Sequence, residues 1–281
     1  MNALPTRGMD RDELIRVAHS YGLDEFTAAS AAANLTNGKA MILAVSGKLA
    51  SGKDTIAPLV LGALGVRDYE QQSFAHALKY ELDLIIGLIR DWFDETPRPA
   101  LTPALRDELA GRIAAHMDFP AEQAREFFTG ALANQVLCVR SLHARSRTKV
   151  IRRALQVLGT EVRRTQDENY WVKRALAEAF KALATGRTVY FTDCRFPNEV
   201  AAPKGAGAFV VRLDVSPAIQ RARLLARDGL IADEAALTHV SEVALDECED
   251  FDVRVLNHGP KAETVAAVVD GLRFSQVAAA A

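Results

Sequence analysis

The stretch from Met41 to Thr55 constrains the fold of this chain more than any other part of the sequence. Residues 41–45 form a continuous apolar run, which is typical of a strand buried on both faces of a parallel sheet. Residues 47–53, which we call the phosphate loop, match the spacing G-x-x-x-x-G-K and precede a helix-like run. Such a loop directs backbone N–H groups, together with the positive end of the following helix, at one point where phosphate binds. This context favours a phosphate-binding loop over the alternative, a glycine turn beside an unrelated lysine.

The phosphate loop and the two residues after it are predicted to bind ATP. Lys53 would reach the β- and γ-phosphates, while Gly47 and Gly52 allow the backbone to approach the nucleotide closely. Asp54 stands where such loops usually carry a Ser or Thr hydroxyl for Mg²⁺, and Thr55 offers a hydroxyl one position later. This form is frequent in kinases of small metabolites and nucleotides, so we expect a transferase rather than a mechanical ATPase. The predicted ATP-binding set is Gly47, Lys48, Ser51, Gly52, Lys53, Asp54 and Thr55.

The composition is that of an ordinary globular protein. Of 281 residues, 49% are hydrophobic and 25% are charged, and the formal net charge is −2, so nothing global indicates a nucleic-acid or membrane partner. The three cysteines have no metal-ligand spacing and are expected to be free thiols in a reducing cytosol. No run of 18 apolar residues exists. We therefore expect a cytoplasmic protein.

The pattern along the chain predicts an α/β three-layer sandwich with a mainly parallel, five-stranded sheet. Residues 1–38 form an N-terminal helical extension that begins with a capping box, Asp10 to Glu13, and we expect a packing or oligomer contact there rather than a functional role. Residues 39–281 form the main domain, with a helical insertion at about 76–165. Strands are predicted at 41–45, 71–74, 188–192, 209–213 and 251–256. Helices are predicted at 52–64 (with Pro58 inside), 77–92, 103–117, 120–137, 148–164, 171–183, 216–227 and 263–274.

Charged residues at four places outside the loop are candidates for chemistry. Asp193 ends a buried strand, where a carboxylate can organise Mg²⁺ through water. Arg223 and Arg227 lie one helical turn apart and suit a lid at about 216–242, with Asp228-Gly229 as its hinge, although surface salt bridges are the alternative. Gly159 is predicted to break a helix just before Glu161, Arg163 and Arg164. The basic cluster at 140–153 is either a solvated face or a patch for an anionic substrate.

Several blocks in one order resemble the deoxynucleoside monophosphate kinases of tailed bacteriophages. The blocks are Gly47–Thr55, Ser73-Phe74-Ala75 with Lys79, Leu155-Gln-x-Leu-Gly-Thr-Glu161, Asp193-x-Arg-Phe-Pro-Asn-Glu199 and His239-x-Ser-Glu242. The resemblance implies a P-loop NTPase fold of the adenylate-kinase type, ATP as donor, Mg²⁺, and a deoxynucleoside 5′-monophosphate as acceptor. Residues 1–38 and 94–150 depart from the compact pattern of that family.

Phosphoryl-transfer chemistry assigns roles within this resemblance, because positioning and positive charge do most of the catalysis. The predicted catalytic residues are Lys53, Asp193, Arg223 and Arg227. Lys79, Arg163, Arg164 and Arg195 are candidates for the acceptor phosphate, and Glu161 for the acceptor's base or sugar. His239 and Glu242 are equally well explained as structural, Glu242 as a capping residue.

Three other functions stay open on the sequence alone. One is a kinase acting on hydroxymethylated bases in phage DNA, against which the balance of charge argues. A second is a phosphomevalonate-type small-molecule kinase, which shares the Gly-Lys-Asp loop. A third is a nucleotide-sensing module without turnover, which the joint presence of Lys53, Thr55, Asp193 and the lid arginines disfavours. The sequence leaves the oligomeric state open, a homodimer included.

Overall fold

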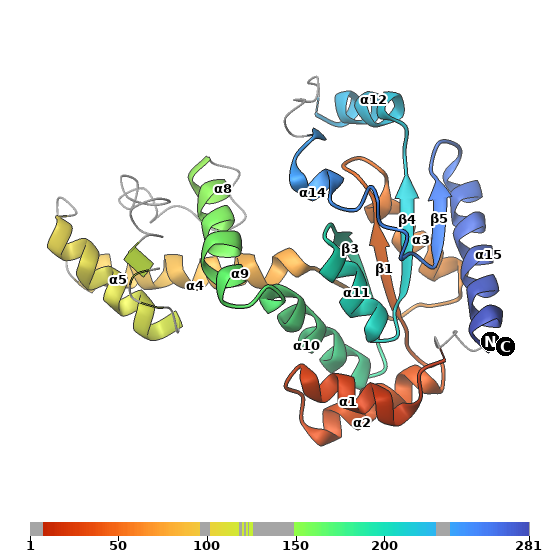
Figure 1. The fold of residues 1–281 in the computed structure, drawn as a ribbon, viewed down its shortest axis with the longest axis horizontal. Coiled ribbons are helices and arrows are strands. Elements are labelled where there is room, and N and C mark those ends of the chain that lie inside the picture. Colours follow the sequence, from red (N-terminus) through yellow and green to blue (C-terminus); the bar gives the residue numbers. More distant parts are fainter. Residues whose placement is uncertain are drawn as a thin grey trace. The chain divides into compact units, whose positions relative to one another are not determined.

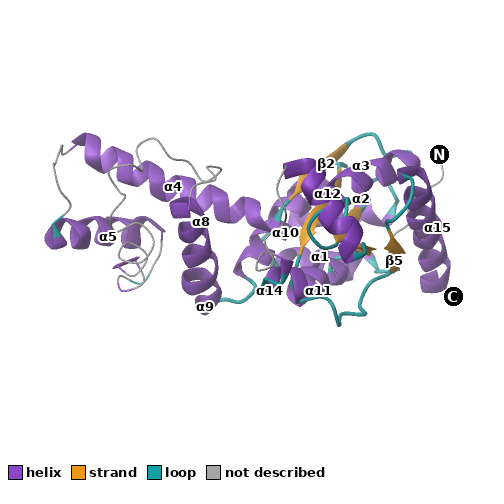
Figure 2. Ribbon diagram, turned by 90° about the horizontal axis from the view of Figure 1, so that it is seen from above, coloured by secondary structure: helices purple, strands orange, loops and turns teal. Residues whose placement is uncertain are grey.

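The computed structural model describes residues 8–95, 102–117, 120, 122, 124–125, 149–228 and 237–280. The chain divides into two compact units, the first made of Met1–Phe74 and Val172–Ala281 and the second of Ala75–Trp171. We call them the sheet unit and the helical insertion, and Figures 1 and 2 show the elements of each. The N-terminal helices belong to the sheet unit.

The sheet unit is built on five strands that all run parallel. They are β1 (Ile42–Ser46), β2 (Tyr69–Gln72), β3 (Thr188–Cys194), β4 (Phe209–Asp214) and β5 (Val253–Leu256), in the spatial order β2-β3-β1-β4-β5. β1 is central and all five of its residues are buried, as its continuous apolar sequence requires. Because parallel strands end at one edge of a sheet, the segments after β1, β3, β4 and β5 share that edge.

Side chains of alternating strand residues pack into two cores, one on each face of the sheet. Leu43 and Val45 of β1 face α3 (Lys53–Ala63) and α15 (Lys261–Ala280), which lie beside β5 in Figure 1. Ile42 and Ala44 face the opposite core, to which α10 (Tyr170–Ala184) and α11 (Pro197–Gly205) contribute. The predicted α/β sandwich with a five-stranded parallel sheet is therefore confirmed.

The N-terminal extension is a pair of helices, α1 (Arg11–Ser20) and α2 (Glu25–Thr36), whose buried residues belong to the second of these cores. Asp10 caps α1 by accepting a hydrogen bond from the Glu13 N–H, and Asp24 caps α2 in the same way. The Asn34 amide donates to the carbonyls of Leu183 and Ala184 at the end of α10, at 2.8 and 3.2 Å. Packing into this core and against the end of α10 thus accounts for these helices.

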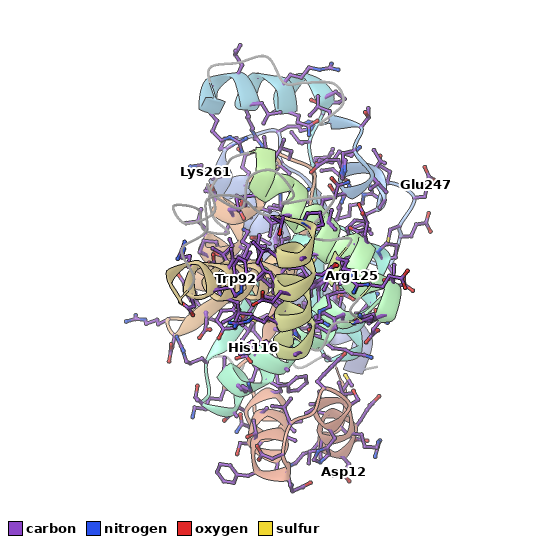
Figure 3. The ribbon with its side chains drawn as sticks, turned by 90° about the vertical axis from the view of Figure 1, so that its left-hand side faces the viewer. Asp12, Trp92, His116, Arg125, Glu247 and Lys261 are labelled. Carbon is purple, nitrogen blue, oxygen red and sulfur yellow. The ribbon has the colours of Figure 1, made fainter. Side chains whose placement is uncertain are left out.

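The helical insertion has its own core. Its described helices are α4 (Phe74–Glu95), α5 (Pro103–Met117), α8 (Lys149–Gln156), the π-helical segment η2 (Val157–Arg163) and α9 (Arg164–Gln166). Trp92, labelled in Figure 3, is buried in this core, and its indole N–H donates to Glu108 at 3.1 Å. The helix predicted at 120–137 lies almost wholly outside the described residues, as do the side chains of the basic cluster at 140–153.

Several predicted boundaries and one predicted break were wrong. Gly159 does not end the helix, because the π-helical segment η2 continues α8 through it. The Gly159 carbonyl accepts the Trp171 indole N–H at 3.0 Å. A side chain at Gly159 would come within 3.1 Å of Leu78, so packing explains the glycine. The second strand lies two residues earlier than predicted, and α11 was not predicted. Pro58 does lie inside α3. Among the described residues, no helix is both long and apolar enough to cross a membrane.

Candidate phosphate-binding site

The phosphate loop joins β1 to α3 through a tight turn that needs glycine at both ends. Gly52 has a φ of 90° and directly precedes α3, a conformation that residues with side chains rarely adopt. At Gly47, a Cβ would lie 2.4 Å from Ser51 Oγ and 2.7 Å from the Leu213 carbonyl. Between them, Ala50 is the single non-glycine residue with positive φ (59°) in the described part of the chain. Such strain at a loop tip is typical of functional sites.

Lys53 is the first residue of α3 and is 6% exposed. Its ammonium donates to the Lys48 carbonyl at 3.3 Å. Burial and then the positive charge of Arg195 lower the pKa of Lys53, whereas nearby carboxylates, including Asp193, raise it. A buried ammonium with one carbonyl contact retains donors for an anion, since Lys has three N–H groups.

Ser51 supplies an independent indication that the loop is built for an anion. Its hydroxyl is buried and has no hydrogen-bond partner among the described residues. A buried hydroxyl normally has a partner, and a phosphate oxygen would provide one. The loop backbone, Ser51 and Lys53 together therefore fit the phosphates of a nucleotide.

The carbonyl oxygens of the phosphate loop are held from α12 (Pro217–Asp228) and from the turn after β5. Gln220 donates to the Leu49 carbonyl at 2.9 Å. Arg223 donates to the carbonyls of Ala50 and Ser51, both at 3.4 Å, and more closely to Asn257 at 2.8 Å. The Asn257 amide donates to the Ser51 carbonyl at 2.7 Å. Arg223 therefore faces the phosphate loop, whereas Arg227, one turn further, is exposed.

The end of β3 brings a carboxylate and a guanidinium to the same edge of the sheet. Asp193 accepts a hydrogen bond from the Ser73 hydroxyl at 2.6 Å. The N–H groups of Arg195 and Phe196 donate to Glu199 at 2.8 and 3.2 Å, which fixes the backbone that follows Asp193. The described residues contain no group of three or more His, Cys, Asp or Glu side chains able to hold a metal. Asp193, predicted to organise Mg²⁺, would supply carboxylate oxygen beside water and phosphate oxygens, a donor set that suits this ion.

Contacts from the segment after β4 reach the other side of the loop. In α14 (Val240–Val243), Glu242 accepts a hydrogen bond from the Leu49 N–H at 2.6 Å and is paired with the Arg195 guanidinium. Lys48, predicted to bind ATP, pairs with Asp246 at 2.7 Å, and its binding of ATP stays a prediction. Residues 229–236, including the Gly229 end of the predicted hinge, lie outside the described residues.

The four predicted substrate residues of the helical insertion do not share one environment. Lys79 and Glu161 are exposed, and Arg164 is half-buried. Arg163 is only 4% exposed; it pairs with Glu81 at 2.6 Å and donates to the Met117 carbonyl at 2.6 Å. Its guanidinium also lies 4.7 Å from the centre of the Tyr170 ring. These contacts give Arg163 a structural role inside the insertion, so we correct the prediction that it binds the acceptor phosphate.

Sequence reasoning assigned no role in the site to Gln220, Asn257 or Ser73. Glu242 was noted in the block His239-x-Ser-Glu242 but was considered a capping residue. His239 has that role, because it accepts from the Ser241 N–H at 3.2 Å. The sequence signal for Glu242 was its place in the block His239-x-Ser-Glu242.

No protein-family model matches this sequence, and a search of curated proteins finds no match. Solved structures similar to this chain include a gluconokinase from Sinorhizobium meliloti 1021, at 14% identity and a TM-score of 0.39, covering 85% of this chain and 95% of that one. A dephospho-CoA kinase from Campylobacter jejuni has 15% identity and a TM-score of 0.39, covering 84% and 98%. TT1252 from Thermus thermophilus has 14% identity and a TM-score of 0.38, covering 84% and 97%.

Identities of 14–15% do not show what this chain binds, but the geometry of the chain itself shows what its loop resembles. A glycine-bounded loop follows the central strand of a parallel sheet, and a buried lysine opens the next helix. This is the arrangement of a P-loop fold.

Proposed function

We propose that this chain is a P-loop kinase that transfers the γ-phosphoryl group of ATP to a deoxynucleoside 5′-monophosphate, giving the diphosphate. The observation that carries the proposal is that two cations lie at one edge of the sheet, Lys53 in the segment after β1 and Arg195 in the segment after β3. Burial and, after it, the positive charge of Arg195 lower the pKa of Lys53. Two cations near a phosphate loop suit a reaction between two phosphate groups, one from the donor and one from the acceptor.

Each residue then has a part that follows from its place. Lys53 binds the γ-phosphoryl group and stabilises the charge that spreads over it during transfer. Arg195 uses one nitrogen for Glu242, and the five N–H donors of a guanidinium leave others for the acceptor phosphate. Asp193 would hold Mg²⁺ through water, and that ion, when bound, neutralises phosphate charge. No general base is needed, because a phosphate oxygen is already a nucleophile.

The identity of the acceptor rests on the resemblance to phage deoxynucleoside monophosphate kinases and on residues of the helical insertion. Lys79, Glu161 and Arg164 keep side chains that are exposed or half-buried. We propose Lys79 and Arg164 as acceptor-phosphate ligands and Glu161 as a ligand of the base or sugar. We also propose residues 216–242 as a lid that would exclude the water that competes with the acceptor. Gln220 and Glu242 in this stretch already contact Leu49 of the phosphate loop, so the proposed movement keeps these contacts.

The test is a panel of acceptors with ATP and Mg²⁺: deoxynucleoside and nucleoside monophosphates, phosphomevalonate, and DNA containing hydroxymethyluracil. We expect ADP and a deoxynucleoside diphosphate to form together, and expect neither from the Lys53→Ala variant. Transfer to phosphomevalonate or to DNA alone would replace the proposed acceptor while keeping the kinase. ATP binding without transfer to any acceptor would favour a nucleotide-sensing module.

A further inference from the structure

We propose that Glu242 is a positioning residue that holds the phosphate loop and Arg195 in one fixed arrangement. This inference rests on the proposed kinase function, because it concerns the arginine that we assign to the acceptor phosphate. From the sequence alone, Glu242 was equally well explained as a structural residue that caps a helix.

The two oxygens of the Glu242 carboxylate have different partners, and both partners belong to the site. Oε2 accepts the Leu49 N–H at 2.6 Å, and Oε1 is paired with Nη1 of Arg195. The Glu242 side chain is 6% exposed, against 28% for that of Arg195. One rigid group thus joins the loop after β1 to the segment after β3.

A buried carboxylate is unfavourable unless charge and hydrogen bonds compensate it. Glu242 has that compensation from Arg195 and Leu49. The N-cap of α14 is supplied separately by His239, which accepts from the Ser241 N–H. The helix therefore does not need Glu242 as its cap.

A second contact from the same segment strengthens the argument. Four residues after Glu242, Asp246 pairs with Lys48 at 2.7 Å, so neighbouring residues of the loop are held by neighbouring parts of one segment. Asp246 also lies 3.5 Å from Arg212, which donates to the Ser46 hydroxyl at the end of β1 at 2.9 Å. Glu247, which follows Asp246, is labelled in Figure 3 and marks the segment there.

Both backbone polar groups of Leu49, its N–H and its carbonyl, are held by side chains. Gln220 of α12 donates to its carbonyl at 2.9 Å, and Glu242 of α14 accepts from its N–H. Groups already fixed in place need no reorganisation during the reaction, which is how preorganised dipoles and charges lower a barrier. Glu242 would supply this preorganisation for the loop and for Arg195 together.

The experiment separates the two oxygens. Glu242→Gln keeps the shape and one oxygen that can accept the Leu49 N–H, but loses the charge that orients Arg195. Glu242→Ala loses both contacts. Ser241→Ala is the matched control, because its hydroxyl contacts His239 and neither the loop nor Arg195.

For Glu242→Gln we expect turnover to fall on the order of tenfold to a hundredfold, as misplacement of a reacting group does, with ATP-analogue affinity changed by less than about threefold. Combining it with Arg195→Ala should lower turnover no further than Arg195→Ala alone, because the two residues act as one unit. For Glu242→Ala we expect, in addition, amide hydrogen exchange in residues 47–53 faster by roughly tenfold. Ser241→Ala should change none of these quantities.

The inference would be overturned if both Glu242 variants had the turnover and the loop hydrogen exchange of Ser241→Ala. It would also be overturned if the losses of turnover from Glu242→Gln and Arg195→Ala added up in the double variant. If Glu242→Ala fails to fold, Glu242→Gln and the double variant decide the question. The exchange measurement is made without acceptor, so it tests the link between Glu242 and the loop even if the wild-type chain transfers phosphate to nothing. That last result would contradict the proposed function and not this link.

Discussion

The phosphate loop and the helical insertion both carry the charged residues expected of a kinase, but their surroundings differ. At the loop, α12, α14 and the turn after β5 each hold backbone groups, and Lys53 is buried among them. In the insertion, buried Arg163 is used by the core of that unit, and Lys79 and Glu161 are exposed. Fixed surroundings are what a group needs where charge develops in a reaction, and the phosphate loop has them.

The strongest test of this difference between the two regions is a substitution of Lys53 in the phosphate loop. Lys53→Ala should lower phosphoryl transfer on the order of a thousandfold or more, because it removes the positive charge that the transferred group meets. Its melting temperature should stay close to that of the wild type, since the small side chain leaves the loop glycines unchanged. A variant that melts normally and retains a tenth of wild-type turnover would show that the loop is not the donor site.

Arg163 provides the opposite case. Arg163→Ala should lower the free energy of unfolding by about 3–5 kcal/mol, because it leaves the buried Glu81 carboxylate without its cation. Arg164→Ala is the control and should change this free energy by less than about 1 kcal/mol. Urea unfolding of both variants is the measurement. A stable Arg163→Ala variant with a raised acceptor KM would return Arg163 to the acceptor site.

A substitution of Asp193 tests whether its carboxylate, at the edge of the sheet, positions a Mg²⁺ ion. Asp193→Asn should lower the rate at saturating ATP by roughly a hundredfold and make it depend on higher Mg²⁺ concentrations, because an amide holds the water shell of the ion poorly. Ser73 can still donate to the amide oxygen, so thermal stability should change little. An unchanged rate and Mg²⁺ dependence would exclude Asp193 from the site.

The two arginines of α12 should give the smallest effects, and unequal ones. Arg223→Ala should raise the transfer barrier by about 2 kcal/mol, because Arg223 contacts the loop carbonyls, whereas exposed Arg227 should contribute only if the lid closes. Hydrogen exchange with and without a bisubstrate analogue measures that closure over residues 216–242. Full activity in both variants, with no added protection, would leave these arginines as surface residues.

The sequence predicted the sheet well where apolar runs are long. β1, β3 and β4 are buried and consist mainly of apolar residues, so periodicity alone placed them within about two residues. β2 reads Tyr-Glu-Gln-Gln and has no apolar run, so its predicted position, 71–74, was two residues too late; its pairing with β3 fixes where it lies. α11 was not predicted, because the segment after Asp193 was interpreted only as leaving the sheet edge; it begins at Pro197, and proline is favoured in the first turn of a helix.

The candidate site was predictable for the loop and much less so elsewhere. The spacing of Gly47, Gly52 and Lys53 determines local geometry, so a motif is enough. The role of Arg163 depends on Glu81, which lies 82 positions earlier, and that of Glu242 on Leu49, which lies 193 positions earlier. Contacts at such separations come from the tertiary fold, and a single sequence does not reveal them.

The helical pair α1 and α2 limits how far this chain can be shortened. A chain shortened to begin at Lys39 would keep every residue of the phosphate loop, yet it would uncover the face of the sheet unit that Leu14, Ala28 and Leu35 now cover. The end of α10 would also lose its Asn34 contacts. Exposed apolar surface of this kind promotes aggregation. A soluble form of the chain must therefore keep the helices that cover this face of the sheet, although the phosphate loop itself does not need them.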